Sequence, residues 1–88
     1  MVKLKDGAEV DLELFKFDSC PFCRIVQQAI EQLGIEGIRL RDTSREPGAN
    51  AELVQRGGMR QVPCLFIDGR PLYESADIVA WLRANVQV

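Results

Sequence analysis

The chain has 88 residues, of which 47% are hydrophobic and 27% are charged, and its formal net charge is -2. This length and composition are ordinary for a small globular protein, so we expect a single domain over residues 1–88. The slight negative charge excludes a general attraction to nucleic acid or anionic lipid. No apolar run approaches the roughly 18–20 residues of a membrane span, so neither nucleic acid nor membrane is an expected partner.

Two residue counts restrict the chemistry: the chain has no histidine and three cysteines. Without histidine there is no Cys-His pair, imidazole base or Cys/His zinc finger within the chain. The first residues lack the apolar core of a signal peptide, so we expect a cytoplasmic protein, and structural disulfides are rare in that compartment. Three cysteines there indicate redox or metal chemistry rather than a disulfide scaffold.

A polar segment and a strand candidate open the chain. Residues 1–10 contain the turn signal Asp6-Gly7, and a short leading strand, a hairpin and a flexible arm are all compatible with them. The strand candidate comprises the apolar residues Leu12, Leu14, Phe15 and Phe17. It leads directly into the first two cysteines.

A helix is predicted immediately after this strand, over residues 21–33. Apolar residues with the spacing of one helical face are Phe22, Ile25, Val26, Ala29, Ile30 and Leu33. Pro21 suits the first helical position because no backbone donor is needed there, and Gly34 stands where a C-terminal cap belongs. Cys20 is therefore the predicted N-cap residue.

The sequence Cys-Pro-Phe-Cys at residues 20–23 carries the chemistry. The cap position turns the Cys20 sulfur toward the free N–H groups of Phe22 and Cys23, and these groups and the helix dipole favour a thiolate. We expect Cys20 to be exposed and Cys23 to be shielded. Cys23 lies one turn further on, close enough for a Cys20–Cys23 disulfide, so the motif supplies an attacking thiolate and a resolving thiol.

The same two cysteines also make half of a structural zinc site. A closed site needs four ligands, and without histidine only Cys64 remains as a further sulfur, so we expect no metal. Cys64 follows a proline in an apolar segment and is interpreted as a buried small hydrophobe.

Five further elements are predicted: a strand at 38–40, a helix at 50–56, strands at 62–67 and 70–73, and a last helix from residue 75. Asn50 and Ser75 are the predicted caps of these helices, and Asp68-Gly69 signals a tight turn. The first two strands are parallel through a right-handed crossover, and the tight turn adds an antiparallel edge. We expect an α/β fold in the order β-α-β-α-β-β-α, a four-stranded mixed sheet flanked by three helices.

These motifs resemble those of a dithiol glutaredoxin: the cysteine motif after a strand, Val-Pro at 62–63 opening a strand, and Asp-Gly after it. The resemblance covers about residues 11–85 and implies a thioredoxin-like fold with Cys20 as nucleophile and Cys23 as resolving thiol. The segment 73–82 looks more like the N-terminal domain of glutathione transferases. A Glu-Ser pair before the last helix holds the γ-glutamyl end of glutathione there.

The resemblance also implies a glutathione site. Ser75 and Asp77, with Glu74, would receive the γ-glutamyl group, Asp77 being the first choice of carboxylate. The bond between Val62 and Pro63 would be cis, leaving the Val62 backbone to pair with the cysteinyl backbone of glutathione. The residue that would lie near the glycyl carboxylate is Arg60.

Two departures from these families stand out. Phe17 occupies the place where many glutaredoxins have a lysine, three residues before the first motif cysteine, and Lys16 is expected to point to the opposite side of the strand. The helical second domain of a transferase is missing from the chain, and with it a site for a hydrophobic co-substrate.

The expected function is that of a glutathione-dependent thiol-disulfide oxidoreductase in electron transport and cell redox homeostasis. It would act as a monomer on protein disulfides or glutathione mixed disulfides, with glutathione as co-substrate. Two alternatives stay open. One is an iron–sulfur carrier whose cluster is bridged between two chains by Cys20 and external thiols. The other is a thioredoxin-like protein that a reductase, not glutathione, reduces.

Overall fold

The computed structural model describes residues 1–87 and is built around one mixed sheet with the strand order β4-β3-β5-β6. Its strands are β3 (Leu12–Lys16), β4 (Arg39–Asp42), β5 (Cys64–Ile67) and β6 (Arg70–Tyr73). β3 and β4 are parallel, and the other neighbours are antiparallel. This arrangement confirms the predicted mixed sheet with a crossover and an antiparallel edge.

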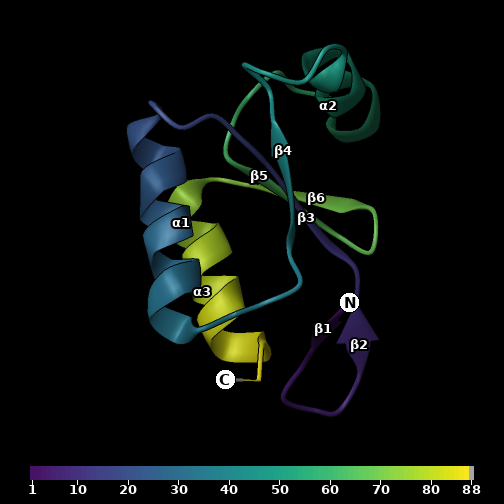
Figure 1. The fold of residues 1–88 in the computed structure, drawn as a ribbon. Coiled ribbons are helices and arrows are strands. Elements are labelled where there is room, and N and C mark those ends of the chain that lie inside the picture. Colours follow the sequence, from purple (N-terminus) through teal and green to yellow (C-terminus); the bar gives the residue numbers. More distant parts are fainter. Residues whose placement is uncertain (88) are drawn as a thin grey trace.

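Three helices cover the sheet: α1 (Pro21–Leu33), α2 (Ala49–Gly57) and α3 (Ser75–Asn85). α1 and α3 lie side by side on one face, and α2 lies on the other (Figure 1). The thioredoxin-like α/β fold is therefore as expected, and β3 is a central strand with helices on both of its faces.

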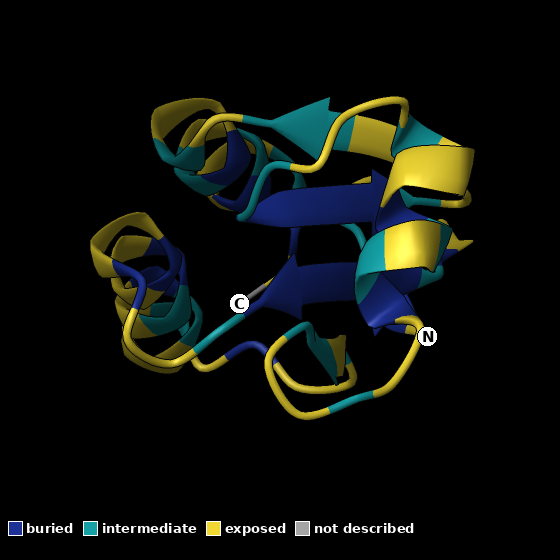
Figure 2. Ribbon diagram, turned by 90° about the horizontal axis from the view of Figure 1, so that it is seen from above, coloured by how far each residue is buried: buried dark blue, intermediate teal, exposed yellow. Residues whose placement is uncertain are grey.

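Alternation along β3 divides the core into two clusters. Leu12 and Leu14 pack toward α1 and α3, with Val26 among their neighbours. Phe15 packs toward α2 against Phe66. The two inner strands, β3 and β5, are accordingly buried, whereas the edge strands β4 and β6 are partly exposed and the helices expose their outer sides (Figure 2).

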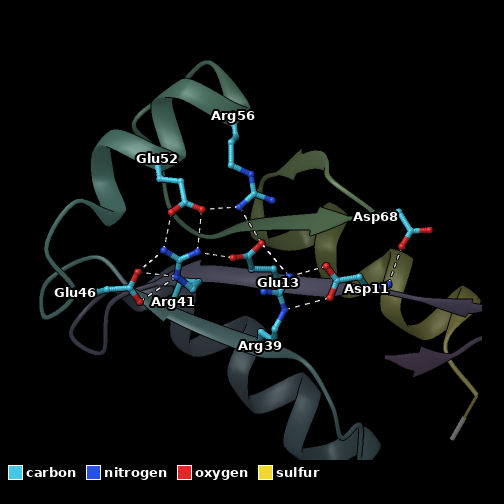
Figure 3. A network of polar contacts seen from close by, with 8 residues as sticks. All are labelled: Asp11, Glu13, Arg39, Arg41, Glu46, Glu52, Arg56 and Asp68. Atoms are coloured by element: carbon cyan, nitrogen blue, oxygen red, sulfur yellow. Dashed lines mark hydrogen bonds and ion pairs between the residues drawn. The ribbon is translucent and has the colours of Figure 1, made fainter.

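Two charged residues of β3 are buried with the apolar ones, because this strand has no solvent-facing side. Glu13 is 2% exposed and Lys16 is 7% exposed. The Glu13 carboxylate accepts hydrogen bonds from the guanidinium of Arg41 at 2.6 Å and forms an ion pair with that of Arg56 at 2.9 Å (Figure 3). The Arg56 guanidinium lies 4.3 Å from the ring centroid of Phe66. Glu13 therefore ties α2 to the sheet.

The predicted caps of α2 and α3 are wrong. α2 begins at Ala49, and its N-cap is Gly48, with φ 82°, not Asn50. α3 begins at Ser75 itself, and its N-cap is Glu74, with φ 73°. In both cases a residue with positive φ directs the chain into the helix, and no side chain caps it. The cap predictions at Cys20 and Gly34 are confirmed.

Strand boundaries also differ from the expectation by one or two residues. β4 begins one residue later than predicted and continues to Asp42, which lies opposite Lys16 in the parallel register. β5 begins only at Cys64, because the preceding proline has no N–H to donate to a ladder. Phe17 lies beyond the end of β3.

A small hairpin, β1 (Val2–Lys3) and β2 (Glu9–Val10), precedes the main sheet. Leu4 forms an antiparallel bridge with Val86, so the hairpin pairs with the segment that follows α3. Figure 1 shows this hairpin below the main sheet. The last residue of the predicted domain, 88, lies outside the described residues. No helix within residues 1–87 has the length and apolar character to cross a membrane.

Candidate active site

The cysteine motif stands at the junction of β3 and α1. Cys20 has extended backbone angles, φ -78° and ψ 119°, and its sulfur accepts a hydrogen bond from the backbone N–H of Cys23 at 3.3 Å. Of the two predicted donors, Cys23 is the one whose N–H makes this bond. Pro21 occupies the first turn as expected. The helix thus presents an N–H group and its positive end to one sulfur.

The prediction that Cys20 is exposed is wrong, since only 6% of the residue is accessible. The sulfur is drawn inward because it accepts a bond from its own helix. Exposure differs from the expectation in the opposite direction at Phe22. Phe22 belongs to the predicted apolar face of α1, yet it is 60% exposed at the edge of the motif.

The other two cysteines are fully buried. Burial is the largest cause that raises the pKa of Cys23, and the neighbouring Cys20 raises it further, while the Phe17 backbone and the Lys16 charge lower it. Burial likewise raises the pKa of the Cys64 thiol to about 11. Cys64 is therefore the buried small side chain that the sequence predicted, and Cys20 is the most accessible thiol.

Alkylation should follow this order of accessibility. With limiting iodoacetamide at mildly acidic pH, we expect Cys20 to be labelled first, because the thiolate reacts and burial opposes ionisation of Cys23 and Cys64. Peptide mass mapping of a time course measures the three rates. Faster labelling of Cys23 or Cys64 would contradict the assignment, and a denatured sample controls for intrinsic reactivity.

A cavity of about 310 Å³ lies beside the motif. It is lined by Phe22, Gln61, Val62, Pro63, Glu74, Ser75 and Ala76. The peptide bond between Val62 and Pro63 is cis, which confirms the expectation. Four of the residues predicted to bind glutathione, from two segments far apart in the sequence, therefore meet in one wall next to Phe22.

The backbone of Glu74 is unusual in this wall. Its φ of 73° is rare for a residue other than glycine, and such conformations cluster at functional sites. Its carboxylate accepts a hydrogen bond from the side-chain amide of Gln61 at 3.1 Å. The carboxylate is thus held at the cavity, directly before the first free N–H groups of α3.

The remaining two predicted binding residues lie elsewhere. Asp77 is in the first turn of α3 and exposed, but it does not line this cavity, whereas Glu74 does. Arg60 lines a second cavity of about 410 Å³, together with Phe17 and other residues. Val62 lines both cavities, which therefore adjoin at this residue.

Sequence reasoning missed the environment of Lys16. Its ammonium lies 2.7 Å from the Asp18 carboxylate and 3.5 Å from that of Asp42. These contacts raise the pKa of Lys16, the hydrogen bond to Asp18 most of all, so the group remains cationic. The available signal was the predicted central strand itself, because a strand with helices on both faces must bury and pair every charge that it carries.

Within residues 1–87, no group of three or more Cys, His, Asp or Glu side chains is placed to hold a metal ion.

A family model described as Glutaredoxin matches residues 12–72. The solved glutaredoxin from Brucella melitensis is 26% identical, with a TM-score of 0.64, and 88% of this chain aligns with 83% of that protein. The search of curated proteins found no match.

Two larger solved proteins contain the same fold. Glutaredoxin 2 from Salmonella typhimurium, in complex with glutathione, is 28% identical with a TM-score of 0.70, over 84% of this chain and 33% of that protein. A delta-class glutathione transferase from Nilaparvata lugens is 26% identical with a TM-score of 0.68, over 81% and 34%. This chain spans about a third of the length of these two relatives. The family match covers more than half of the sequence, and the chain therefore belongs to the glutaredoxin family.

Proposed function

We propose that this protein is a glutathione-dependent thiol-disulfide oxidoreductase that reduces protein disulfides and glutathione mixed disulfides. The observation that carries the proposal is the Cys20 sulfur at the N-terminus of α1, two residues before Phe22, which lines a cavity together with Glu74 and Ser75. The family supports thiol-disulfide chemistry, and a relative solved with glutathione supports the choice of thiol.

With a glutathionylated protein, the Cys20 thiolate attacks the glutathione sulfur. The protein thiol leaves with a proton, and a disulfide between Cys20 and glutathione forms. A second glutathione, as thiolate, attacks the bound glutathione sulfur and releases oxidised glutathione and the Cys20 thiolate. No net change of electrons occurs on the enzyme, and Cys23 is not needed.

With a protein disulfide, Cys20 attacks one sulfur and becomes bonded to the substrate. Cys23 then attacks the Cys20 sulfur, releasing the reduced substrate and leaving a Cys20–Cys23 disulfide. Two molecules of glutathione reduce this disulfide and become oxidised glutathione. The buried Cys23 suits this second step, because it meets only a disulfide already formed on Cys20.

The two cavities suit the two ends of glutathione. The free N–H groups at the start of α3 suit the γ-glutamyl carboxylate, and the Glu74 carboxylate suits its ammonium group. Arg60 in the adjoining cavity suits the glycyl carboxylate. Val62, which lines both cavities, would face the central cysteinyl residue.

Removing the Glu74 carboxylate should weaken glutathione binding. A charge-assisted contact is worth roughly 1.5–3 kcal/mol, so Glu74→Ala should raise the KM for glutathione about tenfold or more. Asp77→Ala is the matched comparison, because it removes a carboxylate on the same helix but outside the cavity lining; its effect should be smaller. Steady-state kinetics and melting temperature are measured together.

If both variants lose stability but keep the KM of the parent, this helix start is structural, and glutathione is the wrong thiol. The broader test is a coupled assay on a glutathionylated peptide, run with glutathione and glutathione reductase and then with thioredoxin reductase. Turnover only with thioredoxin reductase would replace this proposal with the thioredoxin-like alternative.

A further inference from the structure

Lys16 is a buried cation close to the reactive cysteines. Its side chain is 9% exposed, and it stands at the last position of β3, four residues before Cys20. Its two carboxylate partners, Asp18 and Asp42, come from the loop before α1 and from β4. Burying an ammonium group is costly, and the mechanism proposed above leaves this one without a role.

The geometry of β3 and α1 directs Lys16 toward Cys23. Side chains alternate along a strand, so Lys16 shares the face of Leu14, and Leu14 belongs to the same core cluster as Val26 of α1. α1 runs back along β3 after the loop between them (Figure 1). One pleat beyond Leu14 is Lys16, and one helical turn before Val26 is Cys23.

The end of β3 also acts on the ionisation of Cys23. The Lys16 charge and the backbone of Phe17, the residue after Lys16, both lower the pKa of Cys23. Burial and Cys20 act in the opposite direction. The titratable groups that act on Cys23 are thus Cys20 and Lys16.

We propose that Lys16 is a positioning residue for the resolving step: its buried ammonium stabilises the Cys23 thiolate that attacks the mixed disulfide on Cys20. This inference rests on the proposed function and adds to it a residue that acts on the second thiol. Lys16 is the last residue of β3, and the alternation of the strand places it on the face that α1 covers.

The step itself is balanced without a further reactant. The Cys23 thiol loses its proton, and its thiolate attacks the Cys20 sulfur of the Cys20–glutathione disulfide. The Cys20–Cys23 bond forms, the bond to glutathione breaks, and the departing glutathione thiolate takes up a proton. With oxidised glutathione as the starting oxidant, two protein thiols are oxidised and one glutathione disulfide is reduced to two thiols.

Asp18 and Asp42 determine how much of the Lys16 charge reaches Cys23. Asp42 lies opposite Lys16 in the register, and its carboxylate is held anionic by Ser44 and by Lys16, with a pKa of about 2. Arg45 lies 3.3 Å from Asp18 and compensates part of its charge. Because Asp18 is half exposed, it is the partner that can be neutralised with least disturbance of the core.

The test is a rapid-quench time course in which reduced protein is mixed with excess oxidised glutathione and quenched in acid. Mass spectrometry follows the Cys20–glutathione adduct and its conversion to the internal disulfide from pH 6 to 10. Burial raises the pKa of Cys23 to about 12, so conversion should still rise with pH throughout this range. Lys16→Met should raise that pKa by about one unit and should displace the whole conversion profile toward higher pH. At pH 7 the conversion rate should fall about three- to fourfold, because a smaller thiolate fraction is partly offset by higher nucleophilicity.

Three further variants should shift the pH profile in directions that a merely structural role of Lys16 would not produce. Lys16→Arg should restore the profile, Asp18→Asn should shift it downward, and Lys3→Met, at an exposed lysine of the N-terminal hairpin, should leave it unchanged. If the adduct forms normally and the conversion profile of Lys16→Met coincides with that of Lys3→Met, the role of Lys16 is overturned, whereas the proposed function still stands. If Lys16→Met does not fold, an unshifted Asp18→Asn profile overturns it. No adduct on Cys20 in the parent protein would overturn the proposed function.

Discussion

Cys20→Ser is expected to reduce turnover of both substrate classes to the level of the uncatalysed reaction. The reason is that Cys23 and Cys64 are fully buried, and burial raises the pKa of each thiol. Neither can replace a sulfur that sits at the helix N-terminus. The measurement is steady-state reduction of a glutathionylated peptide and of a protein disulfide, each coupled to glutathione reductase.

Cys23→Ser is the matched variant and separates the two reactions. It should keep the reduction of the glutathionylated peptide, because glutathione itself resolves that intermediate, and it should lose the reduction of protein disulfides that need both thiols. Cys64→Ala should retain both activities, since Cys64 packs in the other core cluster against α2. Appreciable turnover by Cys20→Ser would reject the mechanism.

Glu13→Ala is expected to cause the largest loss of stability in the chain. The carboxylate is 2% exposed and meets the guanidinium groups of Arg41 and Arg56, which are themselves held against aromatic rings. Removing one partner of a buried ionic group leaves the others uncompensated and costs about 3–5 kcal/mol. For a domain of typical stability, about 5–15 kcal/mol, that is a large share.

Urea unfolding followed by circular dichroism measures this loss, with Glu36→Ala as the control, because Glu36 is exposed. The control should change the free energy of unfolding by less than about 0.5 kcal/mol. Exposed ion pairs contribute up to about 1 kcal/mol. If Glu13→Ala lowers the free energy of unfolding by less than that, the ion pairs around Glu13 contribute little to stability. Glu13→Gln keeps the shape of the side chain, so its loss in the free energy of unfolding should lie between those of Glu13→Ala and Glu36→Ala.

The sequence was sufficient for the parts of the fold that depend on periodicity and on strong local signals. The apolar spacing after Phe22, Pro21 at the first helical position and Gly34 after the helix predicted α1 over its observed bounds. Asp68-Gly69 predicted the turn between β5 and β6, where both residues have the positive φ values, 49° and 85°, that such a turn requires.

Features that depend on tertiary context could not be predicted from local sequence signals. Asn50 and Ser75 are good cap residues in isolation, but backbone geometry at Gly48 and Glu74 started the helices without a side-chain cap. The exposure of Cys20 depended on the direction in which its sulfur points, which the residue type does not determine. For the site, the roles of the thiols and of the glutathione-binding residues stay predictions. The sequence could not show that Asp77 lies outside the cavity lining, because a position within a helical turn does not fix which side faces a cavity.

The pairing of Leu4 with Val86 makes this fold suitable for terminal fusions and for circular permutation. This bridge joins the N-terminal hairpin to the segment after α3, at the end of the molecule opposite to Cys20, which precedes α1 (Figure 1). A fluorescent reporter fused at either end would leave the thiol accessible, and a short linker between the ends would permit a circular permutant opened at the exposed Asp68-Gly69 turn. The domain is therefore suited to serve as the sensing half of a fused redox probe.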